Sequence, residues 1–131
     1  MNKLDKIILK VIGLLAFGTV AFYFTWWFLL PVTINRRADI EFGDKLVRQI
    51  EEYKKSNGLP DTNDERTLIR LGFKVELYGQ PTYQKLNDTS FQVFYPKGFD
   101  PPYLTWDSKT RNWRMDFPDI PDDWKKEKSD K

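Results

Sequence analysis

Residues 11–30 form an uninterrupted apolar run, VIGLLAFGTVAFYFTWWFLL, which contains no charged residue and no proline. In a helix that rises 1.5 Å per residue, such a run reaches about 30 Å, the thickness of the hydrocarbon core of a bilayer. A secretory signal has a shorter apolar region that ends at small residues, whereas this run ends in aromatic and aliphatic side chains. The run therefore predicts an uncleaved transmembrane anchor.

Aromatic and aliphatic side chains are expected to hold this anchor in the bilayer, which is the first predicted partner of the chain. Tryptophans near the end of a span suit the membrane–water interface. The expected lipid-facing residues are Val11, Leu15, Phe24, Trp26, Trp27 and Leu30.

Lysines precede the span and Arg36, Arg37 and Lys45 follow it, so the positive charges are nearly balanced. Because the N-terminal segment is short and adds its own amino group, we expect the N-terminus in the cytoplasm.

The charge and composition of the remaining chain exclude several classes of function. Three of the 21 basic residues and one of the 19 acidic residues precede residue 31, so the rest of the chain is neutral overall. A neutral domain lacks the basic surface that nucleic acid requires. The chain has no histidine and no cysteine, which removes the usual general base, thiol nucleophiles and nearly all zinc sites. We therefore predict a protein that is not an enzyme, with no cofactor and no small-molecule substrate.

A second helical pattern begins soon after Pro31. Apolar residues recur at spacings of three or four on one face: Ile34, Ala38, Phe42, Leu46, Ile50 and Tyr53. Opposite charges four residues apart predict the ion pairs Arg37–Glu41, Asp44–Arg48 and Glu51–Lys55. Gly58 and Pro60 are typical of a helix end. We expect this helix to continue from the membrane anchor into the domain, with at most a kink at Pro31.

A short helix over residues 64–71 and an antiparallel sheet follow in the sequence. Thr62 or Asn63 is expected to cap the helix, and Leu68, Ile69 and Leu71 to pack under the first helix. Alternating apolar residues then predict strands over 73–78, 83–86, 91–95, 103–107 and 112–117. On the last strand, Trp113, Met115 and Phe117 are expected to face the core. The predicted fold is α+β, with about four antiparallel strands packed on the amphipathic helix.

Two segments resemble parts of type IV pilins and pseudopilins. IEEYKKSNGLP (50–60) is similar to the end of their long helix, and YLTWDSKTRNWRMDF (103–117) resembles their late hairpin. The prepilin cleavage motif is missing, since Gly18 is followed by Thr19 and no acidic residue lies between Lys6 and Asp39. The resemblance implies a pilin-like fold that stays anchored and is not processed into a filament.

The resemblance also implies a location and a role. It places the anchor in a bacterial inner membrane with the domain in the periplasm, as a protein-binding component of a secretion or pilus-type assembly. The alternative is a membrane-tethered immunity protein or inhibitor that neutralises one protein toxin. The expected organisation is a basic segment (1–10), the anchor (11–30), the pilin-like domain (31–120) and a charged, solvated tail (121–131).

Aromatic and acidic residues late in the chain are the candidates for partner binding. Phe94 and Tyr103 have the opposite parity from the core residues of their strands, and Phe99 lies beside Pro101-Pro102 in a stiff loop. Rigid aromatic side chains bind partners at low entropic cost. The acidic, proline-rich segment 116–124 is expected to be extended, covering an edge strand or presenting Asp119, Asp122 and Asp123 to a basic partner.

Overall fold

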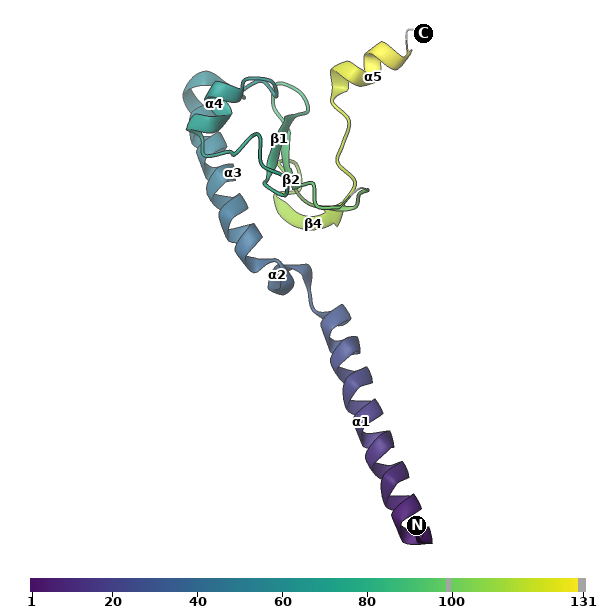
Figure 1. The fold of residues 1–131 in the computed structure, drawn as a ribbon. Coiled ribbons are helices and arrows are strands. Elements are labelled where there is room, and N and C mark those ends of the chain that lie inside the picture. The colour runs from purple at the N-terminus through teal and green to yellow at the C-terminus, as the bar shows by residue number, and fades with distance from the viewer. Residues whose placement is uncertain (99, 130–131) are drawn as a thin grey trace. The chain divides into compact units, whose positions relative to one another are not determined.

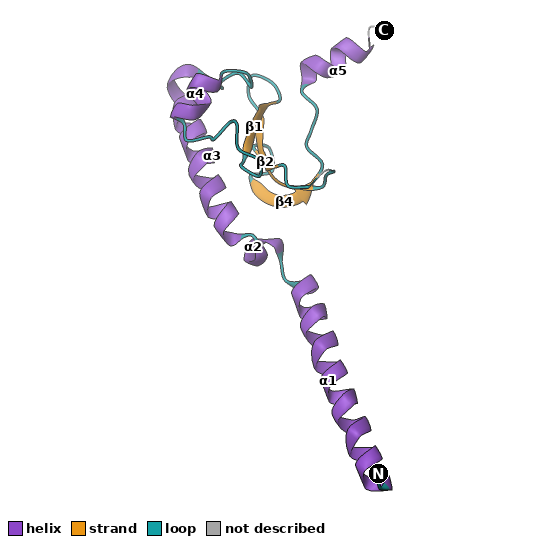
Figure 2. Ribbon diagram, viewed as in Figure 1, coloured by secondary structure: helices purple, strands orange, loops and turns teal. Residues whose placement is uncertain are grey.

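A computed structural model describes residues 1–98 and 100–129 of the chain. It consists of two compact units, Met1–Asn35 and Arg36–Lys131. The first unit is helical, and the second combines helices with one antiparallel sheet (Figures 1 and 2). The predicted α+β class is confirmed.

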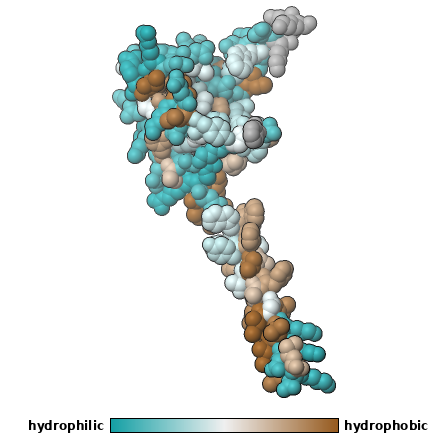
Figure 3. All heavy atoms as spheres, viewed as in Figure 1, coloured by the Kyte–Doolittle hydropathy of each residue, from teal (hydrophilic) through white to brown (hydrophobic). Residues whose placement is uncertain are grey.

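The first unit is dominated by one long apolar helix, α1 (Lys3–Leu29). Hydrophobic residues gather along it and hydrophilic ones at its N-terminal end (Figure 3). The hydroxyls of Thr19 and Thr25 donate to the carbonyls of Leu15 and Ala21 at 2.8 Å, so they are satisfied within the helix. By length and composition, α1 can cross a membrane.

The helix does not continue into the domain, so the expected continuity is wrong. α1 ends at Leu29, and Leu30 adopts an extended conformation (φ −62°, ψ 130°), as a residue before proline generally does. A single turn, α2 (Val32–Asn35), follows. α3 (Arg37–Asn57) begins after Arg36, which has a non-helical conformation (φ −116°, ψ 26°).

The second unit is built on α3, whose apolar face lies against the sheet. Leu46, Val47 and Ile50 are buried, and Phe42 and Tyr53 pack beside them. Ala38 is exposed, so the buried face is shorter than the periodicity predicts. The helix ends at Gly58, which adopts a φ of +74° that favours glycine.

The ion pairs along α3 differ from the prediction at two of three places. Arg37 pairs with Glu41 at 2.8 Å, as expected. Glu51 pairs with Arg111 at 3.3 Å, while Lys55 pairs with Glu52. Asp44 accepts a hydrogen bond from the indole Nε1 of Trp113 at 2.8 Å. Arg111 and Trp113, which lie far along the chain, therefore compete with neighbours on the same helix, and sequence spacing alone does not anticipate these contacts.

The predicted second helix is present as α4 (Glu65–Arg70). Asp64 caps it, accepting a hydrogen bond from the Thr67 N–H at 3.2 Å, in place of the predicted Thr62 or Asn63. Leu68 and Leu71 are buried, but Ile69 is 58% exposed. The expected packing of Ile69 is wrong, because consecutive residues of a helix are turned by about 100° and Ile69 therefore points away from the side that Leu68 buries.

Four strands form the sheet, in the order β1-β2-β3-β4, each antiparallel to its neighbour. They are β1 (Thr82–Lys85), β2 (Phe91–Tyr95), β3 (Tyr103–Asp107) and β4 (Asn112–Asp116). Trp106 pairs with Trp113 and Leu104 with Met115. The core cluster lies between this sheet face and the helices: Leu46, Val47, Ile50, Leu59, Leu68, Leu71, Phe73, Tyr83, Phe91, Val93 and Trp106.

Three expectations about the sheet domain are wrong. Residues 73–78 form turns and not a strand. Met115 and Phe117 are 46% and 66% exposed, because β4 is the edge strand and has no further strand beside it. The tail is helical from Asp122 to Ser129 (α5), although the segment 116–124 was expected to be extended; the expected solvent exposure holds for residues 123–127. Asp122 and Asp123 occupy its first turn, where negative charge complements the helix dipole.

α3 and the sheet lie close together at Gly43. A Cβ at this position would lie 2.3 Å from Cζ2 and 2.4 Å from Cη2 of Trp113. The absence of a side chain at Gly43 therefore lets the indole lie directly on the helix.

We predict that Gly43→Ala destabilises the domain. In an ordinary helix interior this change stabilises by about 0.5–1 kcal/mol, whereas overpacking a core costs about 1–3 kcal/mol. The close indole makes the second effect larger here. Urea unfolding of the full-length protein in detergent measures the difference. In a Trp113→Leu background the cost of Gly43→Ala should shrink; an unchanged or raised stability of the single variant would contradict the packing.

A polar cluster fastens the start of α3 to the end of β2. Arg36 Nε donates to the Asp39 carboxylate at 2.6 Å, and Lys97 Nζ lies 3.4 Å from the same oxygen. The Tyr95 hydroxyl donates to the Asp39 carbonyl at 2.6 Å. Burial opposes ionisation of Asp39, but the hydrogen bond and charge of Arg36, joined by Lys97, outweigh it and hold the pKa of Asp39 below its usual value.

We predict an acid-dependent loss of stability that Asp39→Asn removes. Because the pKa of Asp39 is lower in the folded than in the unfolded protein, its stabilising contribution is present above about pH 4 and is lost as pH falls through the folded-state value. Unfolding midpoints measured from pH 7 down to pH 2 should fall less steeply in Asp39→Asn. Asp100→Asn, at an exposed position, is the control and should follow the parent protein.

Candidate protein-binding surface

The face of the sheet turned away from α3 carries two of the predicted binding residues. The register places Phe94 on β2 and Tyr103 on β3 on this outer face. Their rings stack at a centroid distance of 6.1 Å and an interplanar angle of 11°, and both side chains are half-buried. They form one aromatic platform. Phe99, the third aromatic candidate, lies outside the described residues.

A segment after β4, residues 117–121, crosses the outer face; we call it the crossing segment. Gln92 on β2, which is 1% exposed, donates from Nε2 to the Asp119 carbonyl at 2.9 Å and accepts from the Asp119 N–H at 3.0 Å. The same Nε2 donates to Gln84 Oε1 at 2.7 Å. The segment thus lies over the middle of the sheet. A position over an edge strand was one of the two expectations for it.

The C-terminal end of the crossing segment is tied to the turn after β1. The Asp122 N–H donates to the Leu86 carbonyl at 3.0 Å, and Asn87 Nδ2 donates to the Asp122 carboxylate at 3.1 Å. The hydrogen bonds from Asn87 and Lys125 lower the pKa of Asp122. Asp123 accepts from the Trp124 N–H at 3.0 Å. Asp122 and Asp123 thus both make hydrogen bonds within the chain.

Sequence reasoning missed Gln92, which holds the crossing segment through its main chain. Gln84 and Gln92 are directly opposite each other on neighbouring strands, and two amides at paired outward positions were the available signal. The alternation in 91–95 identified the strand and gave Phe94 on its outward side a binding role, but it gave Gln92 none.

The sequence also did not predict that the loop of residues 74–80 is exposed. Val75, Leu77 and Tyr78 are 43%, 59% and 81% exposed. The loop folds through turns, with Leu77 N–H donating to the Lys74 carbonyl and Gln80 N–H to the Leu77 carbonyl, each at 3.3 Å. Three large apolar side chains therefore project from one short loop.

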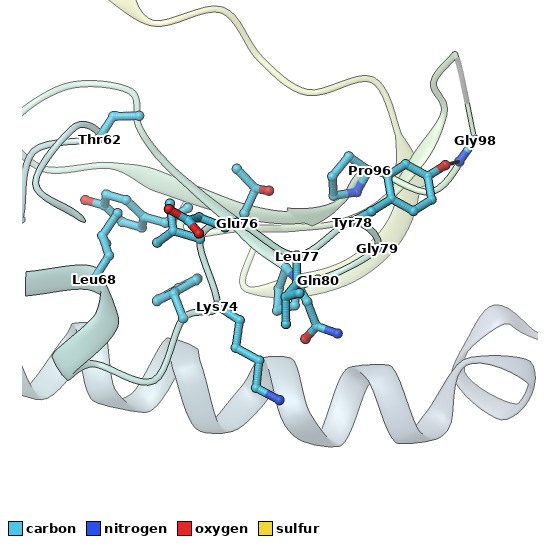
Figure 4. A pocket seen from close by; sticks show the side chains of 15 residues that line it. Thr62, Leu68, Lys74, Glu76, Leu77, Tyr78, Gly79, Gln80, Pro96 and Gly98 are labelled. Carbon is cyan, nitrogen blue, oxygen red and sulfur yellow. Dashed lines mark hydrogen bonds between the residues drawn. The ribbon is translucent and has the colours of Figure 1, made fainter. Parts of the chain in front are cut away.

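A cavity of about 530 Å³ opens beside the 74–80 loop (Figure 4). Leu68, Phe73 and Tyr83 line its inner part, and Pro96 and Gly98 approach from the other side. The Gly98 N–H donates to the Tyr78 hydroxyl at 3.1 Å. Thr82, which also lines the cavity, is paired with Phe94, so the cavity adjoins the aromatic platform at one end of the sheet.

The chemistry of this cavity favours binding of an apolar group. Burial raises the pKa of Tyr83, and its hydroxyl donates to the Pro60 carbonyl at 2.8 Å, so it remains protonated. Lys74 and Glu76 also line the cavity but are exposed to solvent. Over residues 1–98 and 100–129, no group of three or more acidic side chains is placed to hold a metal ion.

Comparison with protein-family models, with curated proteins and with solved structures finds no match. The pilin-like resemblance therefore stays a prediction, and the function is inferred from the chain's own residues.

We predict that Gln92→Leu releases the crossing segment. The change keeps the side chain's bulk but removes both bonds to Asp119, and leaving buried polar groups without partners costs about 1–3 kcal/mol. Hydrogen–deuterium exchange of the full-length protein should show faster exchange over 117–121. Gln84→Leu, which removes one bond to Gln92 and none to Asp119, is the matched control; equal exchange in the two variants would contradict this role of Gln92.

Proposed function

We propose that the protein is a single-pass membrane-anchored protein whose α+β domain binds another protein. The observation that carries the proposal is the 74–80 loop, where exposed aliphatic and aromatic side chains stand beside an apolar cavity. Aromatic side chains such as Tyr78 are enriched in protein interfaces, and the buried centre of an interface is more apolar than the rest of the protein surface. Together with the aromatic platform, the loop and the cavity form the proposed binding surface.

The cavity suits a single apolar side chain of a partner. In protein interfaces, a few large side chains that fill pockets supply most of the binding free energy, and the surrounding contacts exclude water. Leu68, Phe73 and Tyr83 would contact the inserted group, and Leu77 and Tyr78 would close around it. No proton transfer or bond cleavage is required of these residues, which agrees with the proposal that the protein is not an enzyme.

The anchor supports the same proposal by restricting where the domain acts. A domain tethered to a bilayer meets other membrane-bound components at a raised effective concentration. We propose a bacterial inner membrane with the domain in the periplasm. The pseudopilin resemblance favours a component of a secretion or pilus-type assembly as the setting.

The proposed surface is tested by photo-crosslinking in intact cells of the native host. A photoreactive phenylalanine analogue at Leu77 should capture a discrete protein that mass spectrometry identifies. Ile69 is the matched control, since it is an aliphatic residue of nearly equal exposure, 58% against 59%, in another element. Several envelope subunits would support the assembly, and one stoichiometric soluble protein would indicate the inhibitor role. Equal products at both positions, or lipid adducts alone, would overturn the proposal.

We predict that Leu77→Ala weakens binding of the captured partner about tenfold. Truncation of a contact residue at the centre of an interface costs more than about 1 kcal/mol of binding free energy, and about 1.4 kcal/mol corresponds to a tenfold change in Kd. The side chain is exposed, so the unfolding midpoint should not change. Ile69→Ala should alter neither quantity. A Leu77→Ala protein that binds normally would remove this loop from the interface.

A further inference from the structure

β4 leaves one row of backbone groups unpaired. The Ser108 N–H donates to the Phe91 carbonyl, so Ser108 faces β2, and by alternation Tyr103, Thr105 and Asp107 face β4. Their partners Asn112, Arg114 and Asp116 therefore bond to β3. The N–H and C=O groups of Trp113 and Met115 point away from the sheet, and among the described residues no backbone hydrogen bond to them is formed outside the β3–β4 pair.

The opposite edge of the sheet is protected, in contrast to β4. On β1, the Thr62 hydroxyl oxygen accepts a hydrogen bond from the Lys85 N–H at 2.9 Å. Natural proteins usually cover or disrupt an edge strand because it can pair with another chain. The β4 edge instead adds exposed apolar side chains, Met115 and Phe117.

We propose that β4 pairs with β4 of a second copy of this chain, antiparallel and centred on Met115, so that two sheets join into one. This inference concerns self-association and goes beyond the proposed binding of another protein.

The charges of the strand select this register. Since Trp113 and Met115 carry the outward backbone groups, a twofold pairing can be centred on either residue or between them. Centring between them places Arg114 opposite Arg114 of the second copy, and like charges directly opposite are destabilising. Centring on Trp113 would bring Met115 opposite Arg111, which lies in the turn before β4 with a φ of +54°. Centring on Met115 places Arg114 opposite the second copy's Asp116.

The same register also matches the other side chains. Arg114 and Asp116 form an ion pair within the strand. In the proposed register, Arg114 of each copy also lies opposite Asp116 of the other copy, so each of these charges keeps a partner of opposite sign. Met115 lies opposite Met115, and Trp113 opposite Phe117. The Met115 N–H groups donate to the Met115 carbonyls, and the Trp113 N–H donates to the Phe117 carbonyl. The Phe117 N–H already donates to the Asp116 carboxylate at 2.9 Å, so only its carbonyl takes part.

The chain contains no cysteine, so a single introduced thiol reports this pairing directly. Hydrogen-bonded antiparallel partners have Cα atoms about 5.5 Å apart, which a disulfide can span. Full-length Met115→Cys in native membranes should form disulfide-linked dimers on mild oxidation, at least about tenfold more than Lys109→Cys in the exposed β3–β4 turn. Equal yields, or no dimer at Met115→Cys, would overturn the proposal.

A charge exchange in the Met115→Cys background tests the register. Asp116→Arg places arginines opposite each other and should lower the dimer yield at least about fivefold. Arg114→Asp combined with Asp116→Arg restores opposite charges within the strand and across the pair, so the yield should return. Unfolding midpoints confirm that each variant is folded. A folded double variant that fails to restore the dimer would overturn the proposed register.

Discussion

The contact between the Trp113 indole and the backbone of α3 at Gly43 is the constraint on which the rest of the domain depends. The ring lies where a side chain at Gly43 would have to be, and its Nε1 donates to Asp44 in the next position. These two contacts fix both the distance of Trp113 from α3 and the orientation of its ring. Because β4 is paired with β3 throughout its length, this contact also sets the distance of the whole sheet from α3.

The two faces of the sheet consequently have different roles. The face toward α3 is filled by apolar side chains that come from strands and helices alike. The outer face holds a buried amide, Gln92, and the stacked pair of Phe94 and Tyr103, with the crossing segment fastened over it. A polar anchor at Gln92 gives this segment a single position, since only one main-chain residue matches its donor and its acceptor. The surface that remains is aromatic on the sheet and aliphatic on the 74–80 loop.

Alternation identified all four strands of the sheet. Phe91, Val93 and Trp106 are at most 4% exposed, as the alternation of apolar residues in their strands predicts. The same pattern failed at 73–78, where Val75 and Leu77 alternate with polar residues but no neighbouring strand is available to pair with the backbone. Periodicity reports which residues could share a face, whereas burial depends on whether another element lies there. For the same reason, Met115 was assigned to the core although its strand is at the edge.

Local chemistry in the sequence by itself determined the apolar helix, the C-terminal end of α3 at Gly58, and the pairing of β3 with β4, because neighbouring residues decide each of them. A proline after Leu30 was visible too, but only the structure showed that it ends the helix. Contacts between distant residues were decided by the tertiary structure alone: Trp113 on Gly43, Gln92 on Asp119, Glu51 with Arg111, and the cavity beside the 74–80 loop. These depend on which surfaces the packed core leaves facing each other, and no spacing along the chain encodes that directly.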